Sequence, residues 1–151
     1  MMRWYDRFAA IDAGRVHDRA SDNYLDEIYA FFMNCYYLKD WVINDGSIPA
    51  LTNHIIESYI NGSRPLQLCE DICNSLKHLS LTPDKKVPGK IGRSGEVPSF
   101  GKKLFKLGLG GGNLPTISLN YEVKTSSGAE DAFKLATDCV TAWDDFMKKH
   151  G

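Results

Sequence analysis

The feature that most limits the fold of this chain is one long helical segment, residues 24–43, that contains neither Gly nor Pro. Apolar side chains nearly encircle the predicted helix between Ile28 and Leu38. A helix that is apolar on all sides is a buried one. We therefore place this helix at the centre of the domain, with its N-terminal cap at Ser21-Asp22-Asn23 and its end at Asn44-Asp45-Gly46.

Apolar residues at three- and four-residue steps predict further helices that surround the central one. Each begins or ends at a recognisable capping, Pro or Gly signal. These helices are expected at Arg3–Ala13, from Ser47-Ile48-Pro49 to Asn61-Gly62, at Pro65–Leu79, and after a capping box formed by Ser127 and Glu130.

The composition of the chain changes between the fourth predicted helix and the last one. Pro and Gly residues recur from 82 to 101 and predict a long loop. Apolar and polar residues then alternate over Phe105–Leu109 and Ile117–Val123, which predicts an antiparallel hairpin. The expected fold is mainly α: an antiparallel bundle of four to five helices in a single domain, residues 1–151, with the loop and hairpin of residues 82–124 inserted before the last helix.

Composition excludes several classes of protein. Hydrophobic residues make up 43% and charged residues 25% of the 151 residues, which are globular values and argue against disorder. The longest apolar run, Ile28–Met33, is far shorter than the ~20 residues of a membrane-spanning helix. The first seven residues include the charged Arg3, Asp6 and Arg7, and no apolar signal-peptide stretch follows them. We expect a cytoplasmic protein with no membrane partner.

The four cysteines are expected to be reduced and buried. Cys35, Cys69, Cys73 and Cys139 all fall in predicted helices, and no pair has the CxxC spacing of a metal or redox motif. A zinc site built from Cys69, Cys73 and His78 is disfavoured, because His78 lies about 140° around the helix from Cys73 and no fourth ligand is suitably spaced. We therefore expect no metal and no cofactor.

A polar stripe on the fourth helix is the best candidate for chemistry. Asp71, Asn74, Ser75 and His78 follow one another at i, i+3, i+4 and i+7, so they share one face of the helix. A carboxylate near an imidazole can raise its basicity and prepare it as a general base. The alternative is a solvated face, or a structural His–Asp network between helices.

The segment Cys73-Asn74-Ser75-Leu76-Lys77-His78 resembles the signature of the HEPN superfamily of helical bundles. That signature places an Arg before a polar residue, then three residues, then a His. Asn74 and His78 match it, whereas Cys73 stands at the Arg position. The stretches Asn34–Trp41 and Asp71–His78 also look like segments of bacterial proteins, some from mobile elements. The resemblance covers about residues 20–80 and the last helix.

The function that the resemblance implies depends on an Arg of the signature, which this chain lacks. Family members with the intact motif are typically metal-independent ribonucleases and often dimers, in which the Arg stabilises charge on phosphate. Cys73 has neither the charge nor the donors for that task. Our leading prediction is a non-catalytic homodimer that binds RNA or a protein partner. The alternatives are a ribonuclease of toxin or defence type that uses His78 with Asn74, Asp71 and Lys77, and a homo-oligomeric scaffold without a ligand.

Basic residues concentrate in one part of the chain. Residues 77–106 carry a formal charge of +6, so the remainder carries −7. Lysines on a Gly/Pro-rich loop suit a phosphate backbone, and Phe100 and Phe105 could stack on bases. The alternative is a hydrated loop. The predicted nucleic-acid contacts are Lys85, Lys86, Lys90, Arg93, Lys102 and Lys103.

For three remaining groups of residues we expect structural roles. Lys39 and Asp40 are expected to pair between helices, because charges near a buried helix are kept when paired. His17 and His54 are expected to be structural or exposed. Trp4, Trp41 and Trp143 are expected in the core or at a dimer face.

Overall fold

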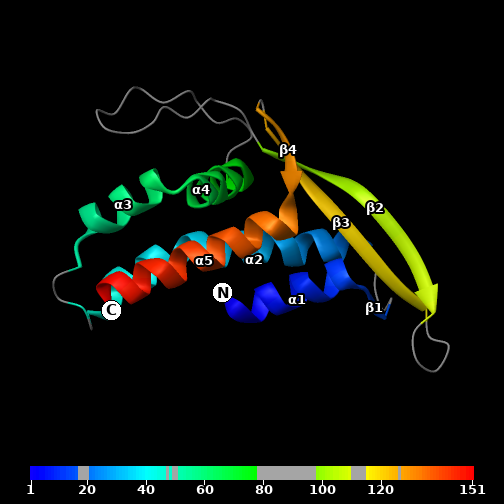
Figure 1. The fold of residues 1–151 in the computed structure, drawn as a ribbon, viewed down its shortest axis with the longest axis horizontal. Helices are drawn as coiled ribbons and strands as arrows, with labels where there is room; N and C mark the ends of the chain where they lie inside the picture. Colours follow the sequence, from blue (N-terminus) through cyan, green and yellow to red (C-terminus); the bar gives the residue numbers. More distant parts are fainter. Residues whose placement is uncertain (17–20, 47, 49–50, 78–97, 110–114, 126) are drawn as a thin grey trace.

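The computed structural model describes residues 1–16, 21–46, 48, 51–77, 98–109, 115–125 and 127–151. Five helices and four strands lie within these residues (Figure 1). In chain order they are α1 (Met2–Ala13), β1 (Arg15–Val16), α2 (Ser21–Asp45), α3 (Asn53–Gly62), α4 (Arg64–Lys77), β2 (Ser99–Leu109), β3 (Pro115–Thr125), β4 (Gly128–Asp131) and α5 (Ala132–His150).

The strands form a four-stranded antiparallel sheet, so the fold is mixed α and β. β3 is its central strand: β2 pairs with one edge along its whole length, while β1 and β4 pair with the other edge at opposite ends. The predicted mainly-α bundle with one inserted hairpin is therefore wrong. β1 and β4 are too short to show an alternating pattern, and their pairing with β3 joins distant parts of the chain.

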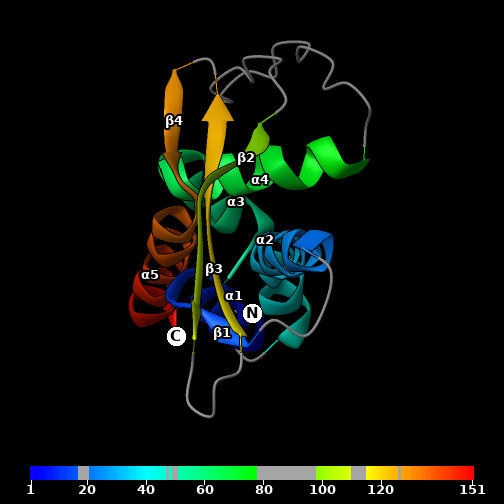
Figure 2. The ribbon, with the colours of Figure 1, turned by 90° about the vertical axis from the view of Figure 1, so that its right-hand side faces the viewer.

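The predicted hairpin strands are present and longer than expected. β2 starts at Ser99, inside the segment expected to be a loop, and its register places Leu107 opposite Ile117. Alternate residues of β3, from Ile117 to Val123, are buried, and α1 and α5 pack against this strand. Figure 2 shows the strands gathered at one end of the helices.

α2 is the central helix, as predicted, but only over part of its length. Tyr24, Ile28, Phe31, Phe32 and Cys35 are fully buried, and α2 packs against α1, α4 and α5. Its later turns are not buried on all sides. The predicted all-round burial is wrong, because one side of α2 is not covered: Met33 and Asn34 are exposed in its middle and Trp41 near its end.

Two helices, α3 and α5, are capped by residues other than those expected from the sequence. α3 begins at Asn53, where the Thr52 side chain accepts a hydrogen bond from the backbone N–H of Ile55. The expected start residues Ser47 and Pro49 lie outside the described residues. α5 is capped by Asp131, which accepts from the N–H of Lys134 at 2.8 Å.

The predicted capping box at the start of α5 is therefore wrong. Ser127 exchanges a hydrogen bond with Thr125 at 2.9 Å, and Glu130 belongs to β4 and pairs with Arg64 at 2.8 Å. A strand, β4, occupies the place of the expected first helical turn. Across the described part of the chain, none of the helices is both long and apolar enough to cross a lipid bilayer.

Candidate functional site

The polar stripe of α4 lies only partly within the described residues. Asp71 and Asn74 are half-buried on α4, and the buried Nδ2 of Asn74 has no hydrogen-bond partner among the described residues. Ser75 donates to the carbonyl of Ile72 at 2.7 Å, so its hydroxyl is bound to its own helix. His78 and the side chain of Lys77 lie outside the described residues. Catalysis by these residues stays a prediction.

The residue at the Arg position of the HEPN-like pattern faces the interior. Cys73 is buried, and its thiol donates to the carbonyl of Phe32 on α2 at 3.2 Å. A side chain at this position packs between two helices, where it has no access to a substrate phosphate. The position therefore contributes to the core and not to a reactive site.

The predicted nucleic-acid contacts are also only partly described. Lys102 is exposed on β2, and Lys103 lies on the same strand without a described side chain. Lys85, Lys86, Lys90 and Arg93 are outside the described residues. Phe100 packs edge-to-face on Tyr29, with ring centroids 5.0 Å apart, so this ring is part of the core packing and does not offer a free stacking face.

A polar network joins α2 to both α3 and α4. Lys39 donates to Glu57 at 3.1 Å and to the hydroxyl of Tyr36 at 2.8 Å. Tyr36 in turn donates to the buried carboxylate of Glu70 at 3.0 Å. The predicted pairing of Lys39 between helices is confirmed. Asp40, its neighbour in the sequence, is exposed.

This network decides which side of α2 faces outward. Residue 41 lies about 200° around the helix from residue 39. Since Lys39 is directed toward α3 and α4, Trp41 is directed away from them, and its side chain is 76% exposed. Of the two places expected for the Trp residues, the core holds for Trp143, which is fully buried, and Trp4 is half-buried. Trp41 is not in the core, and its place at a dimer face stays a prediction.

Trp41 stands beside two hollows in the surface. The larger has a volume of about 480 Å³ and is lined by Leu38, Trp41, Val42, Asn44 and Asp45. The smaller is lined by Asp40, Trp41 and Asn44. We call these six residues the Trp41 surface. A large aromatic side chain exposed beside half-buried apolar ones is typical of a protein-binding site.

The Trp41 surface is acidic. Asp40 and Asp45 are exposed, and α2 ends at Asp45, where the negative end of the helix dipole lies. The nearest cation in sequence, Lys39, is bound inward by Glu57. The sequence does contain a signal for this exposure, because Trp41 directly follows the charged residues Lys39 and Asp40 near the end of the helix.

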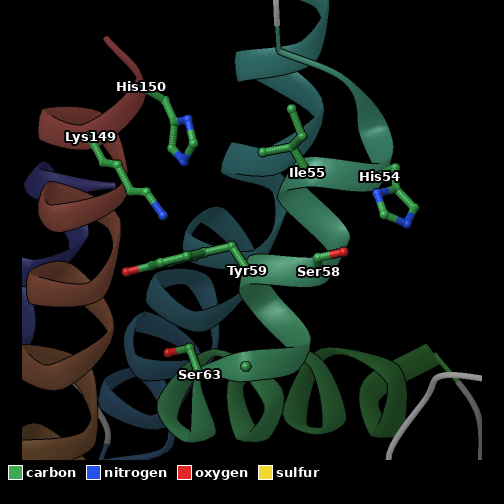
Figure 3. A pocket seen from close by; sticks show the side chains of 8 residues that line it. His54, Ile55, Ser58, Tyr59, Ser63, Lys149 and His150 are labelled. Atoms are coloured by element: carbon green, nitrogen blue, oxygen red, sulfur yellow. The ribbon is translucent and has the colours of Figure 1, made fainter.

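A groove of about 630 Å³ separates α3 from the end of α5 (Figure 3). Tyr59 crosses it and donates to the carbonyl of Ala142 at 2.7 Å; burial raises the pKa of its hydroxyl. His150 packs on the ring of Phe146, with centroids 4.7 Å apart. Figure 3 shows His54 directed away from α5, so the polar groups of this groove do not converge on one point.

The groove nevertheless brings positive charge to the same end of the molecule as the Trp41 surface. Lys148, Lys149 and His150 form the last turn of α5. The C-terminal ends of α2 and α5 both lie at the end away from the sheet (Figure 1). His54 is exposed, as predicted, whereas His17 lies outside the described residues. The Trp41 surface and the last turn of α5 therefore lie toward the same end of the molecule.

Comparison with known proteins gives no relative from which a role could be transferred. No family model, no curated protein and no solved structure matches this chain.

Proposed function

We propose that this chain is a non-catalytic assembly protein that forms a homodimer through the Trp41 surface. The observation that carries the proposal is the exposure of the Trp41 indole beside two hollows. Trp is enriched among the few residues that supply most of the binding energy of an interface. The core position of Cys73, where the HEPN-like pattern requires Arg, supports the non-catalytic part of the proposal.

The charge of the Trp41 surface favours a protein partner over RNA. A base could stack on the indole, but its phosphates would then approach Asp40, Asp45 and the negative end of α2. Nucleic-acid affinity comes largely from neutralising phosphates with Lys and Arg. A basic protein surface is the matching partner.

A second copy of the chain supplies such a surface. Lys148 and Lys149 are exposed in the last turn of α5, where Lys148 lies 3.7 Å from Asp145. The C-terminal ends of α2 and α5 lie at the same end of the molecule (Figure 1). In a two-fold symmetric dimer each subunit presents both patches, so the acidic surface of one copy meets the basic helix end of the other, twice. The resemblance to the HEPN superfamily, whose members are often dimers, agrees with this proposal.

The first test is the oligomeric state of a Trp41→Ala variant. We expect the unmodified chain to have the mass of a dimer by light scattering and Trp41→Ala to shift it to a monomer, with an unchanged circular dichroism spectrum. The matched control is Leu107→Ala, which removes a side chain that is 70% exposed on β2. The sheet lies at the opposite end of the molecule from the C-terminal end of α2 (Figure 1). A monomeric unmodified chain, or a dimeric Trp41→Ala variant, contradicts the proposal.

The second test addresses the pairing of charges. Asp40→Lys and Lys149→Asp are each expected to weaken the dimer at least tenfold, because each places like charges opposite one another. The double variant restores opposite charges and is expected to recover most of the affinity. If the double variant loses as much binding free energy as the two single variants together, the acidic surface does not meet α5 of the second copy.

A further inference from the structure

Three cysteine side chains from three different helices converge in the core. Cys35 comes from α2, Cys69 from α4 and Cys139 from α5, and their sulfur atoms all lie within 4.8 Å of one another. All three are buried. We call them the thiol cluster. It lies away from the Trp41 surface, and the proposed dimer does not use it.

The thiols of the cluster interact with one another and with the backbone. Cys69 donates to the carbonyl of Phe32 at 3.3 Å, and Cys139 to the carbonyl of Pro65 at 3.3 Å. The neighbouring side chains of Cys139 and Cys69 lower the pKa of Cys35 well below its usual range. Burial raises the pKa of Cys69, and the interaction with Cys35 raises that of Cys139. The three side chains of the cluster are therefore in mutual contact.

A buried indole adds a donor on one side of the cluster. Trp143 is almost completely buried, and its Nε1 makes no direct hydrogen bond within the part of the chain that the structure describes. The same side chain favours the thiolate of Cys35. A buried N–H group is more stable when it has an acceptor. An anionic sulfur at Cys35 would give this N–H a suitable acceptor.

We propose that the thiol cluster binds one thiophilic d10 cation, Cu(I) or Zn(II), within the core of the folded chain. Cysteine sulfur is the ligand that these cations prefer. Sulfur atoms that are bound tetrahedrally at about 2.3 Å from a metal lie ~3.8 Å from one another. The distances between the sulfur atoms therefore need to shorten by at most about 1 Å when a metal binds, and small rotations of the three side chains supply this change.

The position of the fourth cysteine, Cys73, determines which of the two cations the cluster fits better. Cys73 lies one helical turn after Cys69 and interacts with it, but it does not belong to the set of mutually close sulfurs. Cu(I) is satisfied by three sulfurs, whereas structural zinc is almost always four-coordinate. The three-sulfur arrangement thus fits Cu(I) as it stands, and Zn(II) requires Cys73 as an additional ligand.

When the thiol cluster binds a cation, its thiol groups release their protons. Each thiol that becomes a ligand loses its proton to solvent, and the sulfur then bonds to the cation with no change in oxidation state. The buried charge of the thiolates is partly neutralised by the cation, and the Trp143 N–H stabilises what remains at Cys35. Because the cluster has no open side, the cation is taken up while the chain folds around it.

The test refolds the full chain with either zinc chloride or a cuprous salt under anaerobic conditions, then removes loose metal and measures the metal content per chain. We expect one equivalent to be retained and X-ray absorption to show sulfur neighbours at ~2.3 Å. We also expect the melting temperature to rise relative to the metal-free chain. A metal content near zero with both cations, or no change in melting temperature, overturns the proposal and leaves the thiols as small apolar core residues.

Serine variants identify the ligands. Cys35→Ser and Cys139→Ser are expected to lower the affinity at least 100-fold in competition with a chelator. The matched control is Cys73→Ser, another buried cysteine of α4: it leaves Cu(I) binding unchanged and releases Zn(II). Metal binding that survives both Cys35→Ser and Cys139→Ser contradicts the site. If a serine variant does not fold, Cys139→Ala removes the same ligand without adding a buried hydroxyl.

Discussion

The hydroxyl of Tyr36 on α2 donates a hydrogen bond to the buried carboxylate of Glu70 on α4 at 3.0 Å. Lys39, one turn further along α2, donates to the same hydroxyl and to Glu57 on α3. Three helices are therefore joined by one polar network. Because this network fixes the rotation of α2 about its axis, it also fixes the outward position of Trp41.

Removing the Tyr36 hydroxyl should destabilise the fold. Tyr36→Phe keeps the ring but removes the donor to Glu70, and loss of a partner for a buried charged group costs about 1–3 kcal/mol. We expect a lower urea midpoint with an unchanged slope. Glu70→Gln is the companion variant, since its amide oxygen still accepts from Tyr36, and it should cost less. Equal stability of Tyr36→Phe and the unmodified chain would show that the network contributes nothing.

The cap of α5 gives a second prediction about stability. Asp131 accepts from the N–H of Lys134, and replacing such an N-cap by Ala costs about 1 kcal/mol. Ser127 lies outside the helix and caps nothing in it, so Ser127→Ala should leave the free energy of unfolding within ~0.5 kcal/mol of its original value. Chemical denaturation of the two variants decides between the observed cap and the capping box suggested by the sequence.

Elements with a long periodic pattern could be predicted from the sequence. The inner stripes of α4 and α5 and the alternation in β3 each extend over several turns or residues, and their buried positions agree with the pattern. β1 and β4 have two and four residues. Their existence depends on pairing with β3, which no local pattern contains.

The functional surfaces depend on contacts between elements and were less predictable. The exposure of Trp41 follows from the direction of Lys39, which is set by Glu57 on another helix. The thiol cluster unites residues far apart in sequence, and spacing within one helix shows only Cys69 and Cys73. The predicted polar stripe of α4 could be traced no further than Asn74 and Ser75, because His78 lies outside the described residues.

The thiol cluster should make the metal-free chain sensitive to alkali. Cys69 and Cys139 have raised pKa values in the folded chain. Above the ordinary thiol pKa of about 8.5, the unfolded chain releases protons that the folded chain keeps, so stability falls as pH rises. Cys35 has a lowered pKa; its contribution is complete above the ordinary value and is lost only as pH falls through the lowered one.

The measurement is the urea midpoint from about pH 7.5 to about pH 9.5 under reducing conditions with a chelator present. We expect a falling midpoint for the unmodified chain and a smaller fall for Cys139→Ala, which removes one of the two thiols that keep their protons. Cys73→Ala leaves both of those thiols in place and should retain most of the fall. A midpoint that does not change with pH would show that the thiols of the core titrate alike in the folded and unfolded chain.

The proposed dimer should weaken as salt is added. Its charged contacts lie at exposed side chains, and the screening length falls from about 10 Å at 0.1 M salt to about 3 Å at 1 M. The dissociation constant, measured by sedimentation at several chain concentrations, is therefore expected to rise across this range. Asp40→Asn removes one of the attracted charges and should flatten the dependence, while Leu107→Ala, on the distant sheet, should preserve it. A dimer that strengthens with salt would instead depend on the apolar contacts of Trp41 alone, and the pairing of its acidic surface with α5 of the second copy would be excluded.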